Sequence, residues 1–328
     1  MFQIQSLEQI VGKDHIRAQE PLSGHTTFRI GGPARWYVEP ETTEDLVLVI
    51  RYLREQGEPY YILGNGSNVL VDDAGVDGVV VCTHGGRGGS LEAVACFAEE
   101  QETRKFFYDQ GYCTPQEVQG KTLVYAGSGI LLSKLAAEVA RQGLAGLEFA
   151  SGIPGTLGGA VTMNAGAYGG EIKDVLVSAR VLDQEGRVRI LTREQLDLGY
   201  RHSVIQQENM IVLDALFALE NGDVREIQNR MRDLNERRRE KQPLEYGSAG
   251  STFKRPEGYF AGKLIQDAGL RGYRVGDVMV SEKHCGFVVN VGKGTCAQTD
   301  RVIEHVQRTV YEQFGVELET EVKRWPTQ

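Results

Sequence analysis

The sequence predicts a globular α+β protein of two or three domains. Three observations lead to this prediction. The chain has 328 residues, which is longer than a typical single domain. Its composition, 41% hydrophobic and 25% charged, is that of a globular protein. Helical periodicity and strand-like alternation both recur along the chain.

Composition also limits the partners and the compartment. The formal net charge of −9 argues against a nucleic-acid surface. Five widely spaced cysteines without a C-x-x-C pair indicate reduced thiols. No apolar run reaches the roughly 18 residues of a membrane helix, and the first residues lack the features of a signal peptide. We expect a cytoplasmic monomer with no membrane or nucleic-acid partner and, because the six histidines do not cluster, no metal.

The first predicted domain covers residues 1–83. A helix is expected over 43–56, with Thr43 as its cap, an apolar stripe along one side, and Gly57 at its end. Strands follow at 60–63, 69–71 and 78–82. The unit therefore reads as β-α-β-β.

The second predicted domain covers residues 84–223. It begins with residues 84–121, which lack a strong period and are predicted to be an exposed insertion with one short helix at most. The regular elements then resume. They are a strand at 122–126, a helix at 130–141, and strands at 175–183, 188–191 and 210–219.

The last predicted domain covers residues 224–328. A polar helix over 223–239 leads into it, with Val224, Ile227, Met231 and Leu234 facing inward. Three elements follow, a helix at 260–268, a strand at 287–291 and a helix at 299–314 capped by Thr299. A final strand is expected over 316–322.

Two glycine-rich stretches are candidate ligand sites. The loop from Gly64 to Asn68 lies between two strands, and its backbone N–H groups suit an anion such as a pyrophosphate. The alternative is a hairpin turn, which Asn-Gly favours. Residues 152–160 carry four glycines and match neither the dinucleotide fingerprint nor a P-loop. This stretch predicts either a cradle for a large flat ligand or a tight crossing in the core.

Charged and hydroxyl residues supply further candidates. Arg201 could hold a carboxylate in a dry site, or could lie on the surface. Ser251 could donate a proton, and Lys254 or Arg255 could hold a phosphate, although a plain Gly/Ser loop would look the same. Glu321 alternates with two other carboxylates on the predicted last strand, where most such groups are simply solvated.

Taken together and in order, these motifs resemble the UDP-N-acetylenolpyruvoylglucosamine reductases, flavoenzymes of bacterial peptidoglycan precursor synthesis. The resemblance covers nearly the whole chain except 84–121. The matching segments are 26–32, 63–70, 146–160, 163–170, 200–203, 250–254, 261–265 and 321–322.

The resemblance implies a fold and a set of cofactors. The fold is an FAD-binding fold of the vanillyl-alcohol-oxidase (PCMH) type in two subdomains, followed by a C-terminal α/β substrate-binding domain. FAD is bound non-covalently, and NADPH is the reductant. The residues expected to contact FAD are Gly64, Asn65, Gly66, Ser67, Asn68, Gly152, Gly155, Thr156, Gly158, Gly159, Asn164, Ala165 and Gly166.

The resemblance also implies the reaction. NADPH reduces FAD, which passes a hydride to C3 of the enolpyruvyl group of a UDP-sugar, UDP-N-acetylglucosamine enolpyruvate, to form UDP-N-acetylmuramate. By motif position, Arg201 and Glu321 stabilise the enolate that develops, and Ser251 donates the proton to C2. The residues expected to bind substrate are Tyr200, Lys241, Lys254 and Arg255.

Departures from the family pattern leave alternatives open. Arg255 stands where the family often has Asn, which affects the expected diphosphate contact. Only a short link joins 210–219 to the helix from 224, so the chain looks like the branch without a substrate-covering Tyr loop. There are two alternative functions. One is another flavin oxidase or dehydrogenase of the same fold, acting on a hydroxy acid. The other is a non-enzymatic binding or regulatory relative with 84–121 as a partner surface.

Overall fold

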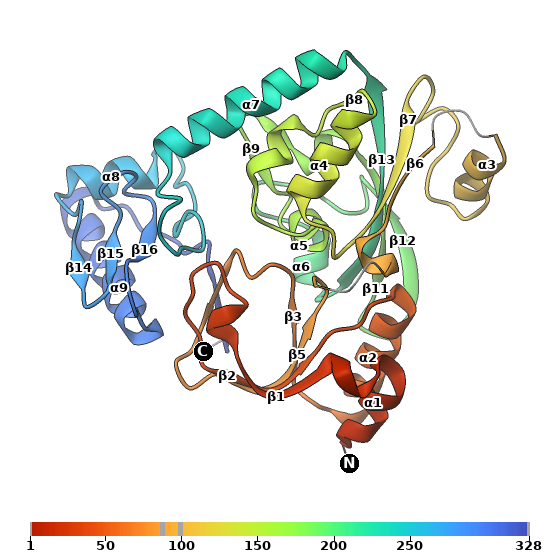
Figure 1. The fold of residues 1–328 in the computed structure, drawn as a ribbon. Coiled ribbons are helices and arrows are strands. Elements are labelled where there is room, and N and C mark those ends of the chain that lie inside the picture. The colour runs from red at the N-terminus through yellow and green to blue at the C-terminus, as the bar shows by residue number, and fades with distance from the viewer. Residues whose placement is uncertain (1, 86–88, 98–100, 327–328) are drawn as a thin grey trace. The chain divides into compact units, whose positions relative to one another are not determined.

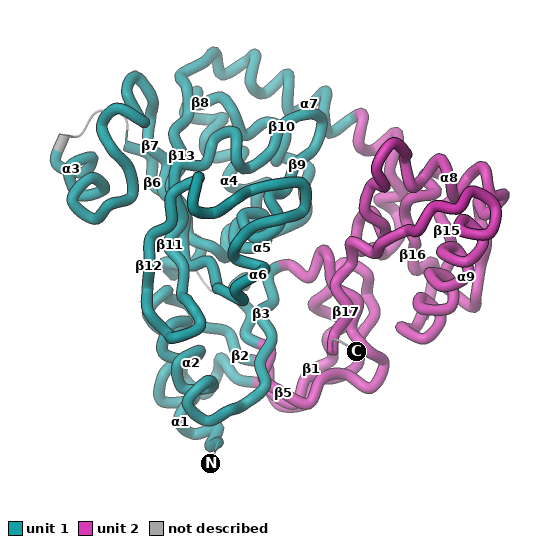
Figure 2. Tube along the Cα trace, turned by 180° about the vertical axis from the view of Figure 1, so that it is seen from behind, with its two compact units in different colours: residues 1–16, 38–64, 81–236 teal, residues 17–37, 65–80, 237–328 magenta. Residues whose placement is uncertain are grey.

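The structure is a computed structural model that describes residues 2–85, 89–97 and 101–326 (Figure 1). The chain forms two compact units, coloured separately in Figure 2. Unit 1 comprises residues 1–16, 38–64 and 81–236, and unit 2 comprises residues 17–37, 65–80 and 237–328. Each unit is described by itself below. Among the described residues, no helix is both long and apolar enough to cross a membrane.

Unit 1 is built on an antiparallel sheet of order β12-β11-β13-β7-β6, with the short β8 also paired to β13. The central strand β13 is buried over nine successive residues, all apolar except Asp214, because both of its faces are covered. The bounds are β6 Val94–Phe97, β7 Thr122–Gly127, β8 Leu144–Ala145, β11 Leu176–Leu182, β12 Val188–Thr192 and β13 Ile211–Asn221.

Helices α4 (Leu132–Arg141) and α5 (Leu157–Thr162) cover one face of this sheet (Figure 1). Successive strand residues point to opposite faces, so Val124 and Phe217 pack against these helices. The core on this side is continuous across both helices and the three central strands. This core supports the strand ends and loops on which the candidate residues of unit 1 lie.

The segment predicted as an exposed insertion covers the opposite face of the same sheet. It contains β6 and helix α3 (Gln101–Asp109). Phe107, Tyr112 and Val118 are buried and pack with Leu123 and Leu216 on the sheet. The predicted short helix is present and many residues of the segment are exposed, but the prediction missed the apolar residues that pack on the sheet. The apolar residues are too widely spaced to show a period, but they meet one sheet face in space.

The N-terminal part of unit 1 holds α1 (Ile4–Val11), α2 (Thr43–Gln56) and β3 (Tyr60–Leu63). The bounds predicted for α2 were correct, but its cap was not. Thr42 is the N-cap, because its hydroxyl oxygen accepts the Asp45 N–H at 3.0 Å. Gly57 ends the helix at φ +63°, a left-handed conformation that glycine adopts without strain.

Several short elements connect these parts of unit 1. They are β9 Gly166–Ala167, β10 Gly170–Glu171, α6 Val204–Gln207 and the 3₁₀ helices Lys13–His15, Ser90–Glu92, Glu148–Gly152 and Ile172–Asp174. Helix α7 (Val224–Lys241) begins in unit 1. Its Ile227 and Leu234 are buried as predicted, whereas Val224 is exposed, because it lies at the start of the helix.

Unit 2 has two parts. In its N-terminal part, β1 (Ile16–Pro21), β2 (Pro33–Val38) and β5 (Val76–Cys82) are neighbours in that order, and the chain crosses between the units within each strand. A 3₁₀ helix, Leu22–Gly24, follows β1. Strand β4 (Val69–Val71) pairs in parallel with β17 (Lys323–Trp325) at the end of the chain.

The second part of unit 2 is a three-stranded antiparallel sheet with two helices. The strands are β14 (Arg274–Val275), β15 (Val278–Val280) and β16 (Val288–Asn290). Helices α8 (Ala261–Asp267) and α9 (Cys296–Phe314) share one core with this sheet.

Two predictions in unit 2 need correction. Helix α9 begins at Cys296 rather than 299, because Thr295 is the cap and accepts the Gln298 N–H at 3.2 Å, while Thr299 is buried inside the helix. Residues 316–322 do not form the last strand. A single bridge at Thr320 precedes β17, which forms where β4 offers a partner edge.

Candidate active site

The predicted FAD loop begins in unit 1 at Gly64, directly after β3. A Cβ atom at Gly64 would lie 2.3 Å from Thr156 Oγ1, so only glycine lets this backbone approach Thr156. The preceding Leu63 carbonyl accepts the Thr83 N–H at 2.8 Å, which fixes the end of β3. The structure thus brings together two residues predicted to contact FAD that are far apart in the sequence.

Thr156 precedes α5, and the start of that helix is tied to the turn after β7. The N–H of Gly158 donates to Ser128 O at 2.7 Å, and a Cβ at Gly158 would lie 3.0 Å from Ser128 Cβ. Ser128 is 1% exposed, and its hydroxyl has no hydrogen-bond partner among the residues that the structure describes. A buried hydroxyl without a partner is unusual and suits a polar group of a bound ligand.

Sequence reasoning missed Ser128. The signal was available, because Gly127-Ser128-Gly129 is a small-residue turn between a strand and a helix. The other predicted glycines of this stretch lie nearby in the chain. Gly152 ends a 3₁₀ helix, Gly155 O accepts the Leu132 N–H at 3.0 Å, and a Cβ at Gly159 would lie 3.8 Å from Thr156 Oγ1.

Asn164 holds the turn after α5. It is buried, has φ +42°, and donates through Nδ2 to Glu171 at 2.8 Å and to Gly199 O at 3.0 Å. Its Oδ1 accepts the Lys173 N–H at 3.0 Å. The hydrogen bonds of the Asn164 side chain thus stabilise the turn itself. Of the neighbouring predicted residues, Ala165 donates its N–H to Ala160 O, and a Cβ at Gly166 would meet Glu171.

Tyr200 and Arg201 lie beside this turn in unit 1. Tyr200 is exposed, and the Arg201 guanidinium carbon is 5.3 Å from the centre of its ring. The segment is anchored because Ser203 Oγ and Gln206 Nε2 both donate to Thr162 O at the end of α5. Arg201 adopts φ +54°, an unfavourable conformation for a side chain of this size.

The pKa of the Glu171 carboxylate depends on these groups. A hydrogen bond from Lys173 is the main cause that holds the pKa of Glu171 below its ordinary value, and the charge of Arg201 contributes. Glu171 is therefore ionised at neutral pH. The structure places the cation predicted to act on the substrate within electrostatic range of the Asn164 turn.

The rest of the FAD loop lies in unit 2. Gly66 has φ +59°, and a Cβ there would lie 2.2 Å from His25 O. Its carbonyl accepts the Thr27 N–H at 3.1 Å. Within the described part of the chain, the N–H groups of Gly66, Ser67 and Asn68 donate no hydrogen bond. Three successive unpaired N–H groups suit an anion such as the pyrophosphate of FAD.

The alternative that this loop is a hairpin turn was wrong, because the two strands that it joins, β3 and β4, lie in different sheets. Asn68 also contacts the C-terminal segment. Its carbonyl accepts the Lys323 N–H at 2.9 Å, and its Nδ2 donates to Glu321 O at 3.2 Å. The sequence gives no signal for this contact, which joins a predicted cofactor residue to a predicted catalytic residue.

The structure brings Ser251 and Glu321 to neighbouring positions in unit 2. The Glu321 N–H donates to Thr252 O at 2.8 Å, and the Lys254 N–H donates to Glu319 O at 2.8 Å. The two segments therefore pair antiparallel, with a bridge between Phe253 and Thr320. Thr252 fixes the first segment, because its N–H donates to Gly286 O and its Oγ1 accepts the Val288 N–H.

The predicted substrate-binding cations of unit 2 have contacts that sequence reasoning missed. Lys254 forms an ion pair with Glu319 on the partner segment. The Arg255 guanidinium carbon lies 4.0 Å from the centre of the Phe260 ring, a cation–π geometry. Lys241 is exposed at the end of α7. The described residues contain no group of His, Cys, Asp and Glu that could hold a metal.

Two family models match the chain. Residues 34–93 and 113–192 match an FAD binding domain, and residues 242–325 match the UDP-N-acetylenolpyruvoylglucosamine reductase C-terminal domain. These matches confirm the predicted fold class, α+β with an FAD-binding domain of the vanillyl-alcohol-oxidase type and the C-terminal domain of the reductase. Residues 94–112, within the predicted insertion, lie outside both matches.

Curated relatives and a solved structure resemble the chain over nearly its full length. A UDP-N-acetylenolpyruvoylglucosamine reductase of Lachnoclostridium phytofermentans is 49% identical over 98% of this chain and 96% of the relative. One from Agathobacter rectalis is 52% identical over 93% of this chain and 92% of the relative. The crystal structure of the reductase from Thermus caldophilus has a TM-score of 0.73 at 34% identity, covering 95% of this chain and 100% of that one. At these identities and coverages, the chain belongs to the UDP-N-acetylenolpyruvoylglucosamine reductase family.

Proposed function

We propose that this chain reduces UDP-N-acetylglucosamine enolpyruvate to UDP-N-acetylmuramate, with FAD as bound cofactor and NADPH as reductant. The family membership and the FAD-binding domain match support the reaction class. The observation that best supports the proposal is the backbone hydrogen bond from the Glu321 N–H to Thr252 O, because it joins the segment of the proposed acid to the residue that follows Ser251.

The residues of both units fit FAD. In unit 2, the free N–H groups of Gly66, Ser67 and Asn68 would hold its pyrophosphate. In unit 1, the approach of Gly64 to Thr156 and the unpartnered hydroxyl of Ser128 provide a close backbone surface and a polar contact. When bound, FAD supplies the chemistry of accepting a hydride from NADPH and donating it to the enolpyruvyl carbon.

Three side chains would carry the rest of the reaction. Ser251 donates a proton to C2, which is basic enough to take it when carbanion character develops. Arg201 is always charged and pairs with the substrate carboxylate as negative charge spreads into it. Glu321 is assigned, with Arg201, to stabilise the enolate that develops.

The remaining cations would bind the substrate. Lys241, Lys254 and Arg255 lie in unit 2, and their positive charges suit the charges of a diphosphate. Tyr200 is exposed beside Arg201 and can lie against the sugar. We assign residues 1–83 and 84–223 to FAD binding and residues 224–328 to substrate binding. The link between β13 and α7 is only residues 222–223, which supports assigning the chain to the branch without a covering Tyr loop.

All five cysteines are free, which supports a reducing compartment, so we propose a cytoplasmic enzyme and expect a monomer. Size-exclusion chromatography with light scattering checks the oligomeric state. A dimer would contradict this expectation without affecting the reaction.

Anaerobic stopped-flow spectroscopy tests the function. The purified protein should be yellow, NADPH should bleach the bound flavin, and UDP-N-acetylglucosamine enolpyruvate should restore its colour. Bleaching by a hydroxy acid without NADPH would favour a different flavin oxidase instead. A colourless preparation that fails to bind added FAD would favour a non-enzymatic relative.

A further inference from the structure

A two-stranded parallel ladder joins the FAD loop to the segment that carries Glu321. In β4 and β17, Lys323 lies opposite Val69, Arg324 opposite Leu70 and Trp325 opposite Val71. The pairing continues past both strand ends. Lys323 donates its N–H to Asn68 O at 2.9 Å, and Asp72 donates its N–H to Trp325 O at 2.7 Å. The ladder therefore sets how far Glu321 lies from Asn68.

Such a ladder needs a further constraint on its register. Parallel pairing is slightly less stable per residue than antiparallel pairing, and an isolated pair of short strands is marginal in water. A slip by one residue would turn every side chain to the other face. Here Val322 is buried against α9 and Arg324 follows it on the same face, so a slip would bring Glu321 and Lys323 there instead.

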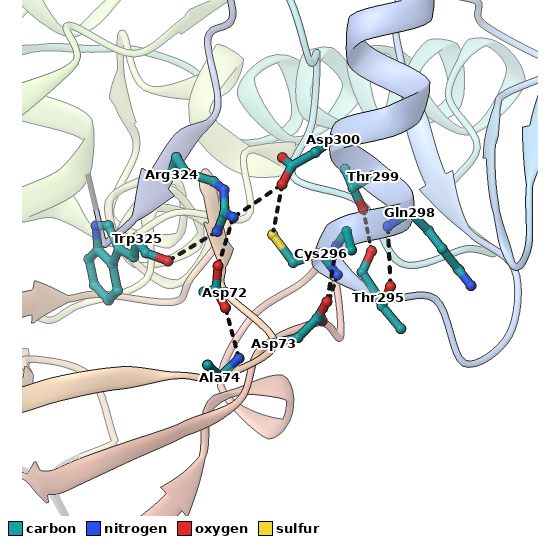
Figure 3. Close-up of polar contacts among 11 residues, drawn as sticks. Asp72, Asp73, Ala74, Thr295, Cys296, Gln298, Thr299, Asp300, Arg324 and Trp325 are labelled. Atoms are coloured by element: carbon teal, nitrogen blue, oxygen red, sulfur yellow. Dashed lines mark hydrogen bonds and ion pairs between the residues drawn. The ribbon is translucent and has the colours of Figure 1, made fainter. Parts of the chain in front are cut away.

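Arg324 supplies that constraint, as Figure 3 shows. Its Nη2 lies 2.8 Å from Asp72 Oδ2, directly after β4, and 3.1 Å from Asp300 Oδ2 on α9. Its Nη1 donates to Trp325 O at 3.3 Å. One guanidinium therefore joins β17 to both neighbouring elements. In this register Arg324 meets both carboxylates.

The neighbouring residue Asp73 holds the start of α9 beside the end of β4. Its two carboxylate oxygens accept the N–H groups of Cys296 at 2.7 Å and Ala297 at 3.0 Å, at the start of α9 (Figure 3). An acidic group at a helix N-terminus is favourable. Cys296, which is 1% exposed, donates its thiol to Asp300. The adjacent carboxylates of Asp72 and Asp73, which follow β4, thus contact β17 and α9 respectively.

We infer that Arg324 is a positioning residue, which holds Glu321 in register with the FAD loop by bridging Asp72 and Asp300. The inference rests on the proposed function, because it assigns Glu321 to the reduction of the enolpyruvyl group. This role predicts a selective effect on the two half-reactions. Loss of the bridge must slow the step that uses Glu321 and spare the step that does not, which is flavin reduction by NADPH.

The test compares R324M with R301M by anaerobic stopped flow, with rates expressed per bound flavin. Arg301 is an exposed arginine of the same helix that Arg324 contacts, which makes R301M a matched control for the loss of one charge. In R324M, reoxidation by UDP-N-acetylglucosamine enolpyruvate should fall by about 10- to 100-fold, because a displacement of about 1 Å can cost 100-fold. Flavin reduction by NADPH should stay within about twofold of the wild type.

If R324M only lost stability, both half-reactions would slow together. Equal changes in the two half-reactions of R324M, or no change in either, would therefore overturn the inference. If R324M folds poorly, D300N serves instead, because it removes the charge of one partner carboxylate at nearly constant shape, and it should show the same selectivity to a smaller extent. Absence of reoxidation in the wild type would overturn the proposed function, and this inference with it. Normal half-reactions in wild type and R324M would overturn the inference alone.

Discussion

Individual residues of the candidate site could be predicted from their motifs, but their contacts could not. Ser251 and Glu321 stand in short segments that resemble the family, and the structure pairs those segments. The Asn68 side chain, by contrast, contacts a carbonyl 253 positions away. Nothing in the local sequence encodes that partner, because it depends on how two distant strands pair. Lys254 likewise pairs with Glu319, which the sequence indicated only as a solvated carboxylate.

The close approach of Gly64 to Thr156 leads to a stability prediction. G64A places a methyl group 2.3 Å from Thr156 Oγ1 and should lower the free energy of unfolding by about 1–3 kcal/mol, the usual cost of overpacking. It should also weaken FAD binding. The control is G24A, since a Cβ at Gly24 has no atom within 4 Å. Urea unfolding and flavin titration check both, and equal stability of the two variants would contradict the packing argument.

Asp72 makes the stability of the protein depend on pH. The Ala74 N–H and the Arg324 guanidinium hold the pKa of Asp72 below its ordinary value. A depressed pKa in the folded state contributes stability above the unfolded value, about 3.9, and this contribution disappears as pH falls through the folded value. The difference in unfolding free energy between wild type and D72N should therefore be largest near neutral pH and shrink below about pH 4. A constant difference from pH 3 to 7 would argue against this role.

At the scale of elements, the long helices with a clear period were predicted well and their first residues less well, whereas α1 and the short helices α5 and α6 were not predicted. Helical periodicity is a property of many residues, so the bounds of α2 were correct. A cap depends on one side chain, and the neighbouring threonines Thr42 and Thr43 offer the same chemistry. In α9, Thr299 looked like a cap, yet it is buried in the helix and Thr295 takes that place. Sequence patterns do not distinguish these cases, because burial decides them.

The cap of α9 can be tested directly. T295A removes the acceptor of the Gln298 N–H and should lower the free energy of unfolding by about 1 kcal/mol. T295S keeps a hydroxyl and should retain most of the stability. Denaturant titration of both variants gives the comparison, and an unchanged T295A would show that the hydroxyl does not stabilise the helix.

The strand at the chain end shows why alternation alone is insufficient. Residues 316–322 alternate as a strand does, but a strand needs a partner edge, and β4 offers one to residues 323–325. The segment 84–121 shows the opposite case. It has no clear pattern, but β6 extends the sheet and Phe107 is buried on its face.

The role of this segment as a cover for the sheet predicts a specific loss. Tyr112 donates its hydroxyl to Asp214, which is fully buried and also binds Arg180. Y112F should cost about 1–3 kcal/mol of unfolding free energy, because the buried carboxylate loses a donor. Y108F is the control, since the Tyr108 hydroxyl makes no hydrogen bond among the described residues. FAD content should stay unchanged in both, and equal stability would show that the Tyr112 contact is dispensable.

At the scale of the molecule, the composition and the order of motifs were enough to predict the family. They were not enough to predict how the chain divides into compact units. The chain crosses between its two units within β1, β2 and β5, so each unit contains separated stretches. Sequence reasoning assigns domains to continuous ranges. The limits at residues 83 and 223 therefore stay predictions about binding roles.

The central claim is that Ser251 protonates the substrate in a family reductase whose paired segments hold it beside Glu321. Single-turnover kinetics of S251A test it most directly. Reduction of the bound flavin by NADPH should remain near the wild-type rate. Reoxidation by UDP-N-acetylglucosamine enolpyruvate should slow by about 100-fold or more, the usual contribution of a positioned proton donor. Reoxidation of S251A at the wild-type rate would contradict the account.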